Sequence, residues 1–438
     1  MHPPCHAGQR KSSAAIFMLL LAASVGAWSV RMTPGSAAQN TARGSFYLKS
    51  GDRVVFYGDS ITDQRLYTTF VENYVVTRFP RLKVSFVHSG WGGDRVTGGG
   101  GGPIDLRLHR DVIAYKPTVM TIMLGMNDGS YRAYDQQIFN TYAAGYKHII
   151  DTVKGALPGI RITVIEPSPF DDVTRAPQFP GGYNAVLVRY GEFVKQLAVE
   201  DGLAVADMNT PLVAALEKAR SADAELAQRI VPDRVHPGPG GHLIMAEALL
   251  KAWNAPAAVS AVEIDAAAKR VVHADNATVT ELHADKSVAW TELDRALPMP
   301  VDLKDPVVEL ALRSSDFVQA LDQEPLKVTG LAASSYQLKI DGDDVGRFSK
   351  EQLADGVNLA VLATPMAKQA TAVHELTVKH NNVHFARWRN MDVPLTDVPS
   401  ADKQAALGAL DKVEADLVAE QHAAAQPKPH HFELVPAP

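Results

Sequence analysis

The chain has 438 residues, of which 46% are hydrophobic and 21% charged, and its formal net charge at pH 7 is −6. This length allows two or three domains, and the apolar content is ordinary for a globular protein with a well-formed core. A nucleic-acid partner is not expected, because binding a phosphate backbone requires a basic surface and no basic stretch stands out.

The first 38 residues have the order of features found in a secretory signal peptide. Arg10 and Lys11 precede an apolar run from Ala14 to Trp28, and small residues follow at positions 36–38. The run is shorter than the roughly twenty residues that span a bilayer. We therefore predict a signal peptide over residues 1–38, export to the periplasm or the exterior, and no stable membrane insertion after cleavage. A retained N-terminal anchor is the alternative.

From residue 50 onward, short β-like runs alternate with helical patterns. This alternation predicts a parallel sheet covered by helices on both faces, because each strand-helix-strand unit crosses over with the same hand. We expect a three-layer α/β/α sandwich over residues 45–255, with five strands in the order 2-1-3-4-5. The predicted strands are Val54–Tyr57, Val84–His88, Val119–Leu124, Ile162–Ile165 and Ala204–Ala206, and the predicted helices are Arg65–Phe79, Ile104–Ala114, Tyr134–Ala156, Tyr183–Asp201 and Leu243–Trp253.

Past Ala255 the sequence changes to alternating runs that suit half-exposed strands. Asp341-Gly342 separates two such runs as a hairpin turn would. We predict a mainly β accessory region over residues 256–398. Residues 399–438 are expected to form a helical and disordered tail, with the disorder beginning at Pro427.

The expected role of the β region is packing on the catalytic domain. Carbohydrate binding is the alternative, because aromatic rings can stack on sugars. The candidate rings are Trp290, Tyr336, Phe385 and Trp388, although their spacing shows no platform.

Ser60 stands in the turn between the first predicted strand and its helix. Its surroundings read Gly58-Asp59-Ser60-Ile61-Thr62, and a side chain there would lie at the carboxyl edge of the sheet, where open α/β folds bind their ligands. Taken alone, such a turn is better explained by helix capping than by a nucleophile. Thr62 replaces the second glycine of the G-x-S-x-G elbow, which argues against an ordinary α/β-hydrolase.

Three later stretches add the other parts of a hydrolytic site. Gly90, Gly92 and Gly93 follow the second strand and let backbone N–H groups approach a ligand, and Asn127 brings an amide to the same sheet edge. Asp233 lies three residues before His236, near enough to fix the imidazole tautomer while His236 takes the serine proton. Because serine is a poor nucleophile without a base, this spacing selects His236 among the 15 histidines.

In this combination and order, the four stretches resemble the conserved blocks of the SGNH hydrolases, the GDSL esterase/lipase superfamily, over roughly Asp52 to Trp253. The resemblance implies a flavodoxin-like SGNH fold and an ester hydrolase. It also implies that Ser60 is the nucleophile, His236 the general base and Asp233 the group that orients the histidine.

The same resemblance implies an oxyanion hole formed by the Ser60 and Gly93 backbone N–H groups and the Asn127 side chain. Two positions depart from the usual pattern. Block one has Ile61 where the name of the superfamily implies leucine, and block two has Gly92 where many members have serine.

The resemblance leaves the ester open, because this fold and triad serve many substrates. Trp91 and Tyr131 would bring aromatic faces to the cleft for sugar rings; both are equally explained as core or rim aromatics. With predicted export, we favour hydrolysis through an acyl-enzyme that removes acetyl groups from carbohydrate, as in the carbohydrate acetylesterase-like branch. A lysophospholipase or aryl esterase is the alternative, and a glycan-binding module without catalysis is the alternative of another class.

No cofactor is expected. The histidines and acids show no metal-ligand spacing and no His-Glu-x-x-His motif, so no metal site is predicted. The expected partner is a small-molecule or polysaccharide ester.

Overall fold

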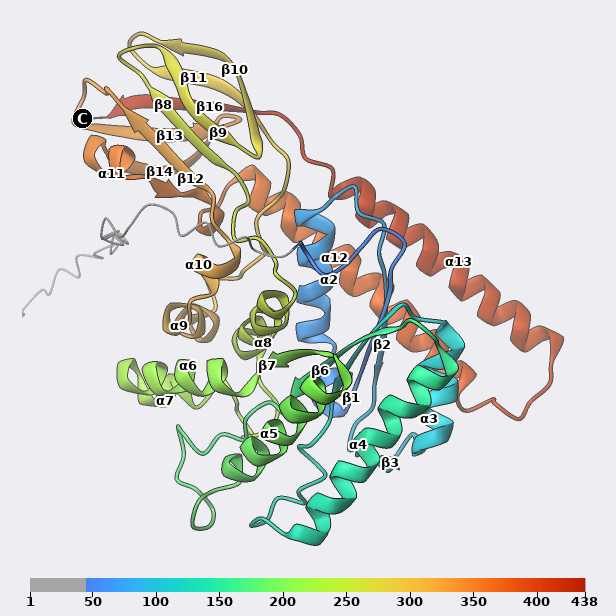
Figure 1. Cartoon of the computed structure of the whole chain (residues 1–438). Coiled ribbons are helices and arrows are strands. Elements are labelled where there is room, and N and C mark those ends of the chain that lie inside the picture. Colours follow the sequence, from blue (N-terminus) through green and yellow to red (C-terminus); the bar gives the residue numbers. More distant parts are fainter. Residues whose placement is uncertain (1–44, 438) are drawn as a thin grey trace, which may run out of the picture. The chain divides into compact units, whose positions relative to one another are not determined.

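A five-stranded parallel sheet forms the centre of the N-terminal half (Figure 1). The computed structural model describes residues 45–437, and the predicted signal peptide over residues 1–38 lies outside them. The strand order β2-β1-β5-β6-β7 is the expected order 2-1-3-4-5, which confirms the predicted fold class. The strands are β1 (Arg53–Gly58), β2 (Ser85–Gly90), β5 (Val119–Met123), β6 (Arg161–Glu166) and β7 (Ala204–Asp207).

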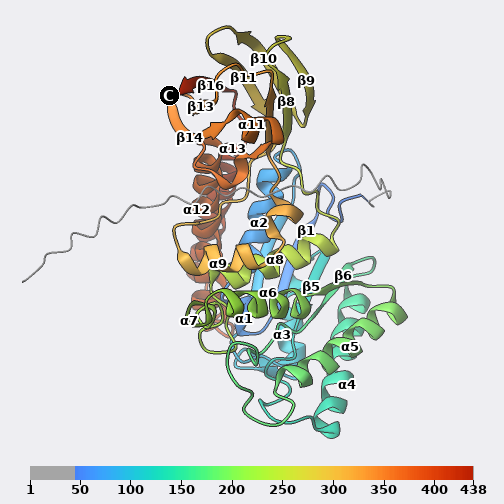
Figure 2. The same ribbon diagram turned by 90° about the vertical axis from the view of Figure 1, so that its left-hand side faces the viewer.

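Helices cover both faces of this sheet, as expected for strands that are buried on both sides. Figure 2 shows β1, β5 and β6 between α2 and α8 on one side and α4 and α5 on the other. The helix α8 begins four residues earlier than predicted, because Pro239 fits the first turn of a helix. The main helices are α2 (Leu66–Arg78), α3 (Ile104–Asp111), α4 (Gln136–Ala156), α5 (Asn184–Asp201) and α8 (Pro239–Ala252).

Shorter elements complete this half. The sequence analysis assigns no element between β7 and Asp233, and the structure has two helices there. Across residues 45–437, no helix is long and apolar enough to cross a membrane. The shorter elements are α1 (Ser60–Asp63), β3 (Gly98–Gly99), β4 (Gly102–Pro103), η1 (Ile113–Tyr115), α6 (Asn209–Ala222) and α7 (Ala224–Ala227).

The C-terminal region is mainly β, as predicted. Its five-stranded antiparallel sheet has the order β10-β11-β16-β13-β14, and a second sheet has the order β15-β12-β8-β9. Asp341 and Gly342 both have positive φ between β13 and β14, which suits a tight hairpin turn. The strands are β8 (Ala261–Asp265), β9 (Arg270–Asp275), β10 (Ala277–Ala284), β11 (Val288–Asp294), β12 (Pro325–Thr329), β13 (Ser335–Ile340), β14 (Asp343–Ser349), β15 (Val357–Asn358) and β16 (His430–Ala437).

The end of the chain is ordered, which contradicts the expectation of disorder from Pro427. The strand β16 lies between β11 and β13 and is hydrogen-bonded to both. Its alternate side chains Phe432 and Leu434 are fully buried. The sequence analysis missed this strand for two reasons. The prolines before it masked its alternation of buried and exposed side chains, and its partner strands lie far away in the sequence.

Three of the four aromatics considered for carbohydrate binding lie inside the protein. Trp290 and Trp388 are almost completely buried, as is Tyr336. Trp290 stacks on Phe432 of β16 with ring centroids 5.1 Å apart. These rings therefore stabilise packing and have no face free for a sugar.

Helices from the C-terminal region also pack against the N-terminal half. Helices α9 and α10 contribute to the same hydrophobic core as the parallel sheet, and α12 packs on α2. The secondary structure therefore changes at the predicted boundary, residue 255. The hydrophobic core of the N-terminal half nevertheless extends past this residue into α9 and α10. The helices are α9 (Pro306–Ser314), α10 (Phe317–Leu321), α11 (Lys350–Asp355), η2 (Leu359–Val361), α12 (Pro365–Phe385), the π-helical turn η3 (Ala386–Asp392) and α13 (Ala401–Ala424).

A buried carboxylate on α2 joins the C-terminal helices to the parallel sheet. Glu72 accepts hydrogen bonds from His380 of α12 at 2.5 Å and from Gln421 of α13 at 3.0 Å. Burial alone would raise the pKa of Glu72, but the His380 imidazole and its hydrogen bond hold that pKa well below its usual range. A buried pair of this kind favours one arrangement of α12 on α2, because any arrangement that separates the two groups leaves a buried polar group unpaired.

Four buried carboxylates, Glu292, Asp294, Asp322 and Glu324, gather where β11 and β12 approach α2. Both Glu324 oxygens lack a hydrogen-bond partner among the described residues, and Arg78 of α2 faces Asp322 at 3.5 Å. Burial raises the pKa of Glu324 well above its usual range, and the neighbouring acids raise it further. When the pKa of a carboxyl is higher in the folded than in the unfolded state, its contribution to stability is fully present below the unfolded-state pKa, about 4.3 for glutamate. That contribution is lost as the pH rises through the folded-state pKa.

We expect Glu324→Gln to raise the melting temperature at pH 8 by about 2 to 4 °C, equivalent to about 1 kcal/mol, because glutamine stays neutral there. At pH 4 the gain should vanish. Thermal unfolding at both pH values measures the difference, with the exposed Glu420→Gln as matched control. Equal melting temperatures of variant and wild type at pH 8 would contradict this expectation.

Candidate active site

The turn that follows β1 places Ser60 at the carboxyl edge of the sheet. Asp59 caps the short helix α1 by accepting the Ile61 backbone N–H at 3.0 Å. Gly58 is required where this turn meets β5, because an added Cβ would lie 2.7 Å from the Met123 carbonyl oxygen. The local sequence therefore holds the serine rigidly at the point where the sheet ends.

Ser60, His236 and Asp233 form one hydrogen-bonded chain. The Ser60 Oγ lies 2.8 Å from Nε2 of His236, and Nδ1 of His236 lies 2.7 Å from Oδ2 of Asp233. The other Asp233 oxygen accepts the backbone N–H groups of Val235 at 2.9 Å and His236 at 2.7 Å. The structure thus brings together the three residues that the sequence analysis selects, in the order required for proton transfer.

Asp233 is held in its ionised form. Burial alone would raise its pKa, but the hydrogen bonds from the His236 backbone, the His236 ring and the Val235 backbone lower it below its usual range. An ionised carboxylate at Nδ1 keeps the proton on that nitrogen and leaves Nε2 free to accept the Ser60 proton.

A long loop that the sequence analysis did not connect to the site supports the Asp233 turn. Arg175 donates to the carbonyl groups of Gln228, Val231 and Pro232, each at 2.9 Å. The Asp171 backbone N–H donates to the Arg234 carbonyl at 2.8 Å. No sequence signal could have shown these contacts, because the partners lie more than fifty residues apart.

Gly93 and Asn127 are the residues that, with Ser60, the resemblance assigns to an oxyanion hole. Gly93 has φ +76°, which favours glycine, and within residues 45–437 neither its N–H nor that of Ser60 donates to a protein acceptor. The Asn127 amide donates one N–H to the Asp94 carbonyl at 3.0 Å and keeps a second N–H. Its Oδ1 accepts the Tyr131 hydroxyl at 2.9 Å. Because the Asp94 carbonyl can only accept, these contacts fix which side of the amide is nitrogen.

Trp91 does not present a face to substrate, which contradicts its expected role. Its side chain is only 9% exposed, and the Arg389 guanidinium lies over its ring, 3.0 Å from the centroid. Trp388 meets the same ring edge-on at 5.7 Å. Both covering residues come from η3, almost three hundred residues further along the chain. Trp91 is therefore a core aromatic.

Tyr131 lies at the rim, with 40% of its surface exposed. Partial burial raises the pKa of its hydroxyl to about 12, so the hydroxyl stays protonated and can donate to Asn127. Its ring packs against Tyr183 with centroids 5.1 Å apart. The position is compatible with contact to substrate, and its hydroxyl orients the Asn127 amide.

We expect Tyr131→Phe to lower kcat by about 3- to 10-fold with little change in KM, because a lost neutral hydrogen bond is worth about 1 kcal/mol. Initial rates with an aryl acetate measure both constants. Tyr134→Phe is the matched control, since its hydroxyl donates only to the exposed Gln136. Equal rates for Tyr131→Phe and wild type would show that the amide is held without this hydroxyl.

Arg107, which the sequence analysis did not single out, stabilises the loop after β2 that carries Gly93. It is fully buried and donates to Asp94 at 2.7 Å and to the Ser89 carbonyl at 2.9 Å, and it also pairs with Asp111. These contacts tie helix α3 to the loop that carries Gly93. A single arginine in a helix gives no sequence signal for such a role.

His242 has a packing role. Its Nδ1 accepts the Tyr67 backbone N–H at 3.2 Å, and Nε2 lies 3.0 Å from Gln64. Burial lowers the pKa of His242 to about 3, so the ring stays neutral. In the described part of the chain, no three His, Cys, Asp or Glu side chains are grouped to hold a metal ion.

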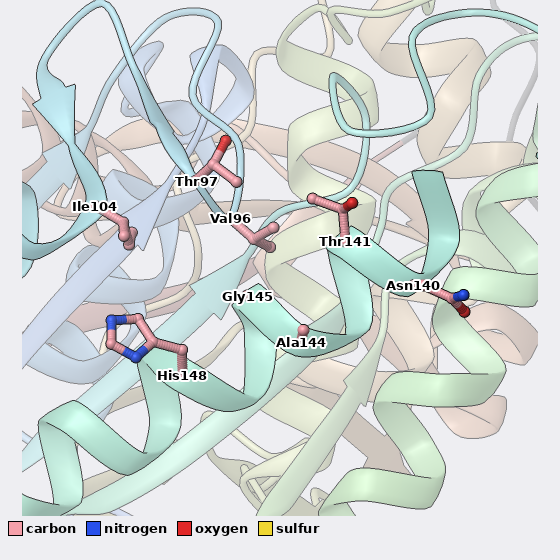
Figure 3. Close-up of a pocket in the computed structure, with 8 residues that line it drawn as sticks. All are labelled: Val96, Thr97, Ile104, Asn140, Thr141, Ala144, Gly145 and His148. Carbon is pink, nitrogen blue, oxygen red and sulfur yellow. The ribbon is translucent and has the colours of Figure 1, made fainter. Parts of the chain in front are cut away.

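An open groove of about 610 Å³ lies beside α4 (Figure 3). Val96 and Thr97 face the α4 residues Thr141, Ala144 and His148 across it. None of the predicted site residues lines this groove. We therefore assign the reaction to the Ser60 turn, where the chemistry-bearing side chains meet.

Comparisons with known proteins agree with this fold. Residues 56–244 match the GDSL-like Lipase/Acylhydrolase family. An acetylxylan esterase of Geobacillus stearothermophilus is 27% identical over 234 residues, which cover 47% of this chain and 94% of that protein.

Two solved structures are similar as well. The gut microbial diltiazem-metabolizing enzyme BT4096 has 25% identity and a TM-score of 0.77, covering 90% of this chain and 100% of that one. The acetylxylan esterase Axe2 of Geobacillus stearothermophilus has 25% identity and a TM-score of 0.39, covering 48% of this chain and 96% of that one.

The sheet, the motif order and the family match together define an ester hydrolase. Residues 56–244 belong to the GDSL-like lipase/acylhydrolase family of the SGNH hydrolase superfamily, which confirms the resemblance drawn from the four sequence blocks.

Proposed function

We propose that this protein is an exported serine esterase that removes acetyl groups from carbohydrate through an acyl-enzyme. The observation that carries the proposal is the hydrogen-bonded chain from Ser60 through His236 to Asp233. Among the described residues, the Ser60 and Gly93 backbone N–H groups donate to no protein acceptor, which supports their proposed role as oxyanion donors. Similarity to an acetylxylan esterase over 234 residues supports acetyl as the acyl group. Export rests on the signal-peptide pattern of residues 1–38.

In the proposed reaction, Ser60 Oγ attacks the ester carbonyl carbon while Nε2 of His236 takes its proton. The negative oxygen of the tetrahedral intermediate is stabilised by the Ser60 and Gly93 N–H groups and by the free Asn127 N–H. The C–O bond to the alcohol then breaks, and His236 returns the proton to the leaving oxygen. Water, deprotonated by His236, attacks the acyl-enzyme and releases acetate and Ser60.

Asp233 orients His236 throughout and stabilises the imidazolium that forms in each half of this cycle. The ring is 33% exposed, so a substrate can reach the Ser60 side of the imidazole from solvent. We propose no cofactor and no metal for this chemistry.

A second candidate is hydrolysis of small-molecule esters. The observation that favours it is the similarity to the diltiazem-metabolizing enzyme, which extends over 90% of this chain and so includes the C-terminal region. Diltiazem carries an acetate ester, so both candidates use the same bond chemistry and differ in the alcohol.

A lysophospholipase is less well supported. The loop from Pro167 to Tyr183 is held by the polar contacts of Arg175 and Asp171 instead of forming an apolar lid. A glycan-binding module without catalysis is also disfavoured, because the structure keeps a complete proton-transfer chain. Covalent labelling of Ser60 by a phosphonate would exclude such a module.

We propose residues 45–255 as the catalytic domain and the mainly β region after residue 255 as its accessory. The tail from residue 399 contributes α13 and the strand β16 to that accessory. No nucleic-acid partner is proposed. Trp91 is omitted from the proposed substrate contacts, whereas Tyr131 remains.

Acetate release tests the proposal. The panel is acetylated xylan, acetylated pectin, an aryl acetate, diltiazem and a lysophospholipid, each with wild type and Ser60→Ala. We expect release from acetylated saccharides and none from the variant. Release from diltiazem and aryl acetate alone would favour the small-molecule candidate, and hydrolysis of the lysophospholipid alone would contradict both.

A further inference from the structure

The C-terminal turn η3 reaches Trp91, in the loop that carries Gly93, through two side chains, Trp388 and Arg389, and only the second of these is charged. The Arg389 guanidinium covers the Trp91 ring at 3.0 Å from the centroid, and Nη2 lies 3.8 Å from Oδ2 of Asp63. The side chain is 18% exposed and makes these contacts across the two halves of the chain. Arg389 therefore contacts both Trp91, in the loop that carries Gly93, and Asp63, in the short helix that begins at Ser60.

Trp91 and Asp63 hold that loop in place. Oδ2 of Asp63 accepts the Gly92 N–H at 3.1 Å, and Asp63 itself lies three residues after Ser60 in α1. The backbone N–H of Trp91 donates to the Gly58 carbonyl at 3.0 Å. These two hydrogen bonds fix the backbone just before Gly93. They therefore help to set the direction in which the Gly93 N–H points.

We propose that Arg389 is a positioning residue for the oxyanion hole: by clamping Trp91 and Asp63, it aims the Gly93 N–H at the reacting oxygen. The C-terminal segment would then be a working part of the active site. This inference rests on the proposed serine-esterase function, and specifically on the role of Gly93.

The placement of Arg389 differs from that of its neighbour Arg387. Arg387 pairs with Asp411 at 2.6 Å and Asp392 at 3.5 Å, both within the C-terminal segment. Arg389 instead extends out of the segment toward the serine turn. Trp388 between them donates its indole N–H to Asp111 at 2.7 Å, so the π-helical turn is anchored beside α3. Such turns occur frequently at functional sites.

The electrostatic surroundings also argue against a passive surface arginine. Arg107 and Arg110 approach the same indole at 5.0 and 5.4 Å from its centroid, so three guanidinium groups surround one ring. Burial lowers the pKa of Arg389, Asp63 opposes this effect, and Arg107 adds to it. The Arg389 guanidinium is therefore held beside two other positive groups by its specific contacts with Asp63 and the face of Trp91.

Arg389→Met tests the proposal, because methionine keeps apolar contact with Trp91 and removes the charge. We expect kcat for an aryl acetate to fall about 10- to 100-fold with KM within about 2-fold, since a misplaced donor weakens stabilisation of the transition state alone. Arg389→Lys restores a charge near Asp63 without a planar group on Trp91, so part of the loss should return. Arg387→Met, which loses two ion pairs in the same turn, should keep kcat within about 2-fold.

Two readouts separate positioning from loss of fold. In a double-mutant cycle, Arg389→Met and Asp63→Asn should be non-additive, because both act through the Gly92 amide. In Arg389→Met, the pKa of Asp63 should rise further, because Arg389 is one of the groups that lower it, beside Arg65 and Arg107. Since protonated Asp63 would hold the Gly92 N–H less strongly, the acidic limb of the kcat/KM profile should move to higher pH. Melting temperatures identify any variant that is simply unfolded.

An Arg389→Met variant that is folded and keeps the wild-type kcat overturns the inference and leaves the proposed function standing. Equal losses in the Arg389 and Arg387 variants also overturn it, because they indicate general loosening of the turn. A wild-type protein that hydrolyses no ester in the panel overturns both the proposed function and this inference.

Discussion

Replacing Ser60 with alanine is expected to lower kcat for an aryl acetate by about 10⁴- to 10⁶-fold, the range found when a serine nucleophile is removed. The reason is geometric: Ser60 Oγ is the group placed 2.8 Å from the base His236, and alanine has no atom to form the acyl-enzyme. Initial rates of acetate release, together with covalent labelling by a phosphonate, measure the effect.

Ser130→Ala is the matched control for this change. Ser130 lies close to Asn127 in the sequence, is exposed, and makes only a 3.5 Å contact with a backbone carbonyl, so its loss should change rates by less than about 2-fold. Adding His236→Ala to Ser60→Ala should produce little further loss, because the two groups act as one unit. A Ser60→Ala protein with more than a small fraction of wild-type turnover would refute the nucleophile assignment.

Replacing Asn127 with alanine is expected to lower kcat by about 10²- to 10³-fold, about 3 to 4 kcal/mol, while KM changes little. Asn127 holds one N–H on the Asp94 carbonyl and keeps a second N–H. In the proposed mechanism alanine therefore removes a donor that acts mainly in the transition state. Steady-state kinetics on the same aryl acetate separate kcat from KM.

Asn140→Ala, an exposed asparagine on α4, serves as control and should leave both constants unchanged. Tyr131→Phe combined with Asn127→Ala should be no worse than Asn127→Ala alone, because the tyrosine hydroxyl acts through the amide. If Asn127→Ala retained full turnover, the oxyanion donors would have to be sought elsewhere.

The burial of Trp91 changes how substrate recognition is to be sought. A sugar cannot stack on a ring covered by Arg389, so contacts to the alcohol part must come from other rim residues, of which Tyr131 is the candidate already identified. The same contact is the basis for the catalytic role that we propose for Arg389 in the C-terminal region.

By itself, the sequence was sufficient for the parallel sheet and the family, and it singled out Ser60, Asp233 and His236, which the structure joins in one hydrogen-bonded chain. The signals for these features are local: a buried run followed by a turn identifies each strand edge, and three residues separate the acid from the histidine. Such short-range patterns survive in the linear chain, because one turn or one strand produces them.

Only the tertiary structure decided the environment of Trp91, the position of β16 and the bracing of the Asp233 turn by Arg175. Each depends on contacts between residues from about fifty to three hundred positions apart, and such contacts leave no periodic pattern. The physical reason is that burial is set by the sum of many weak contacts from several elements, so an aromatic or arginine side chain takes its role from whichever distant segment packs on it.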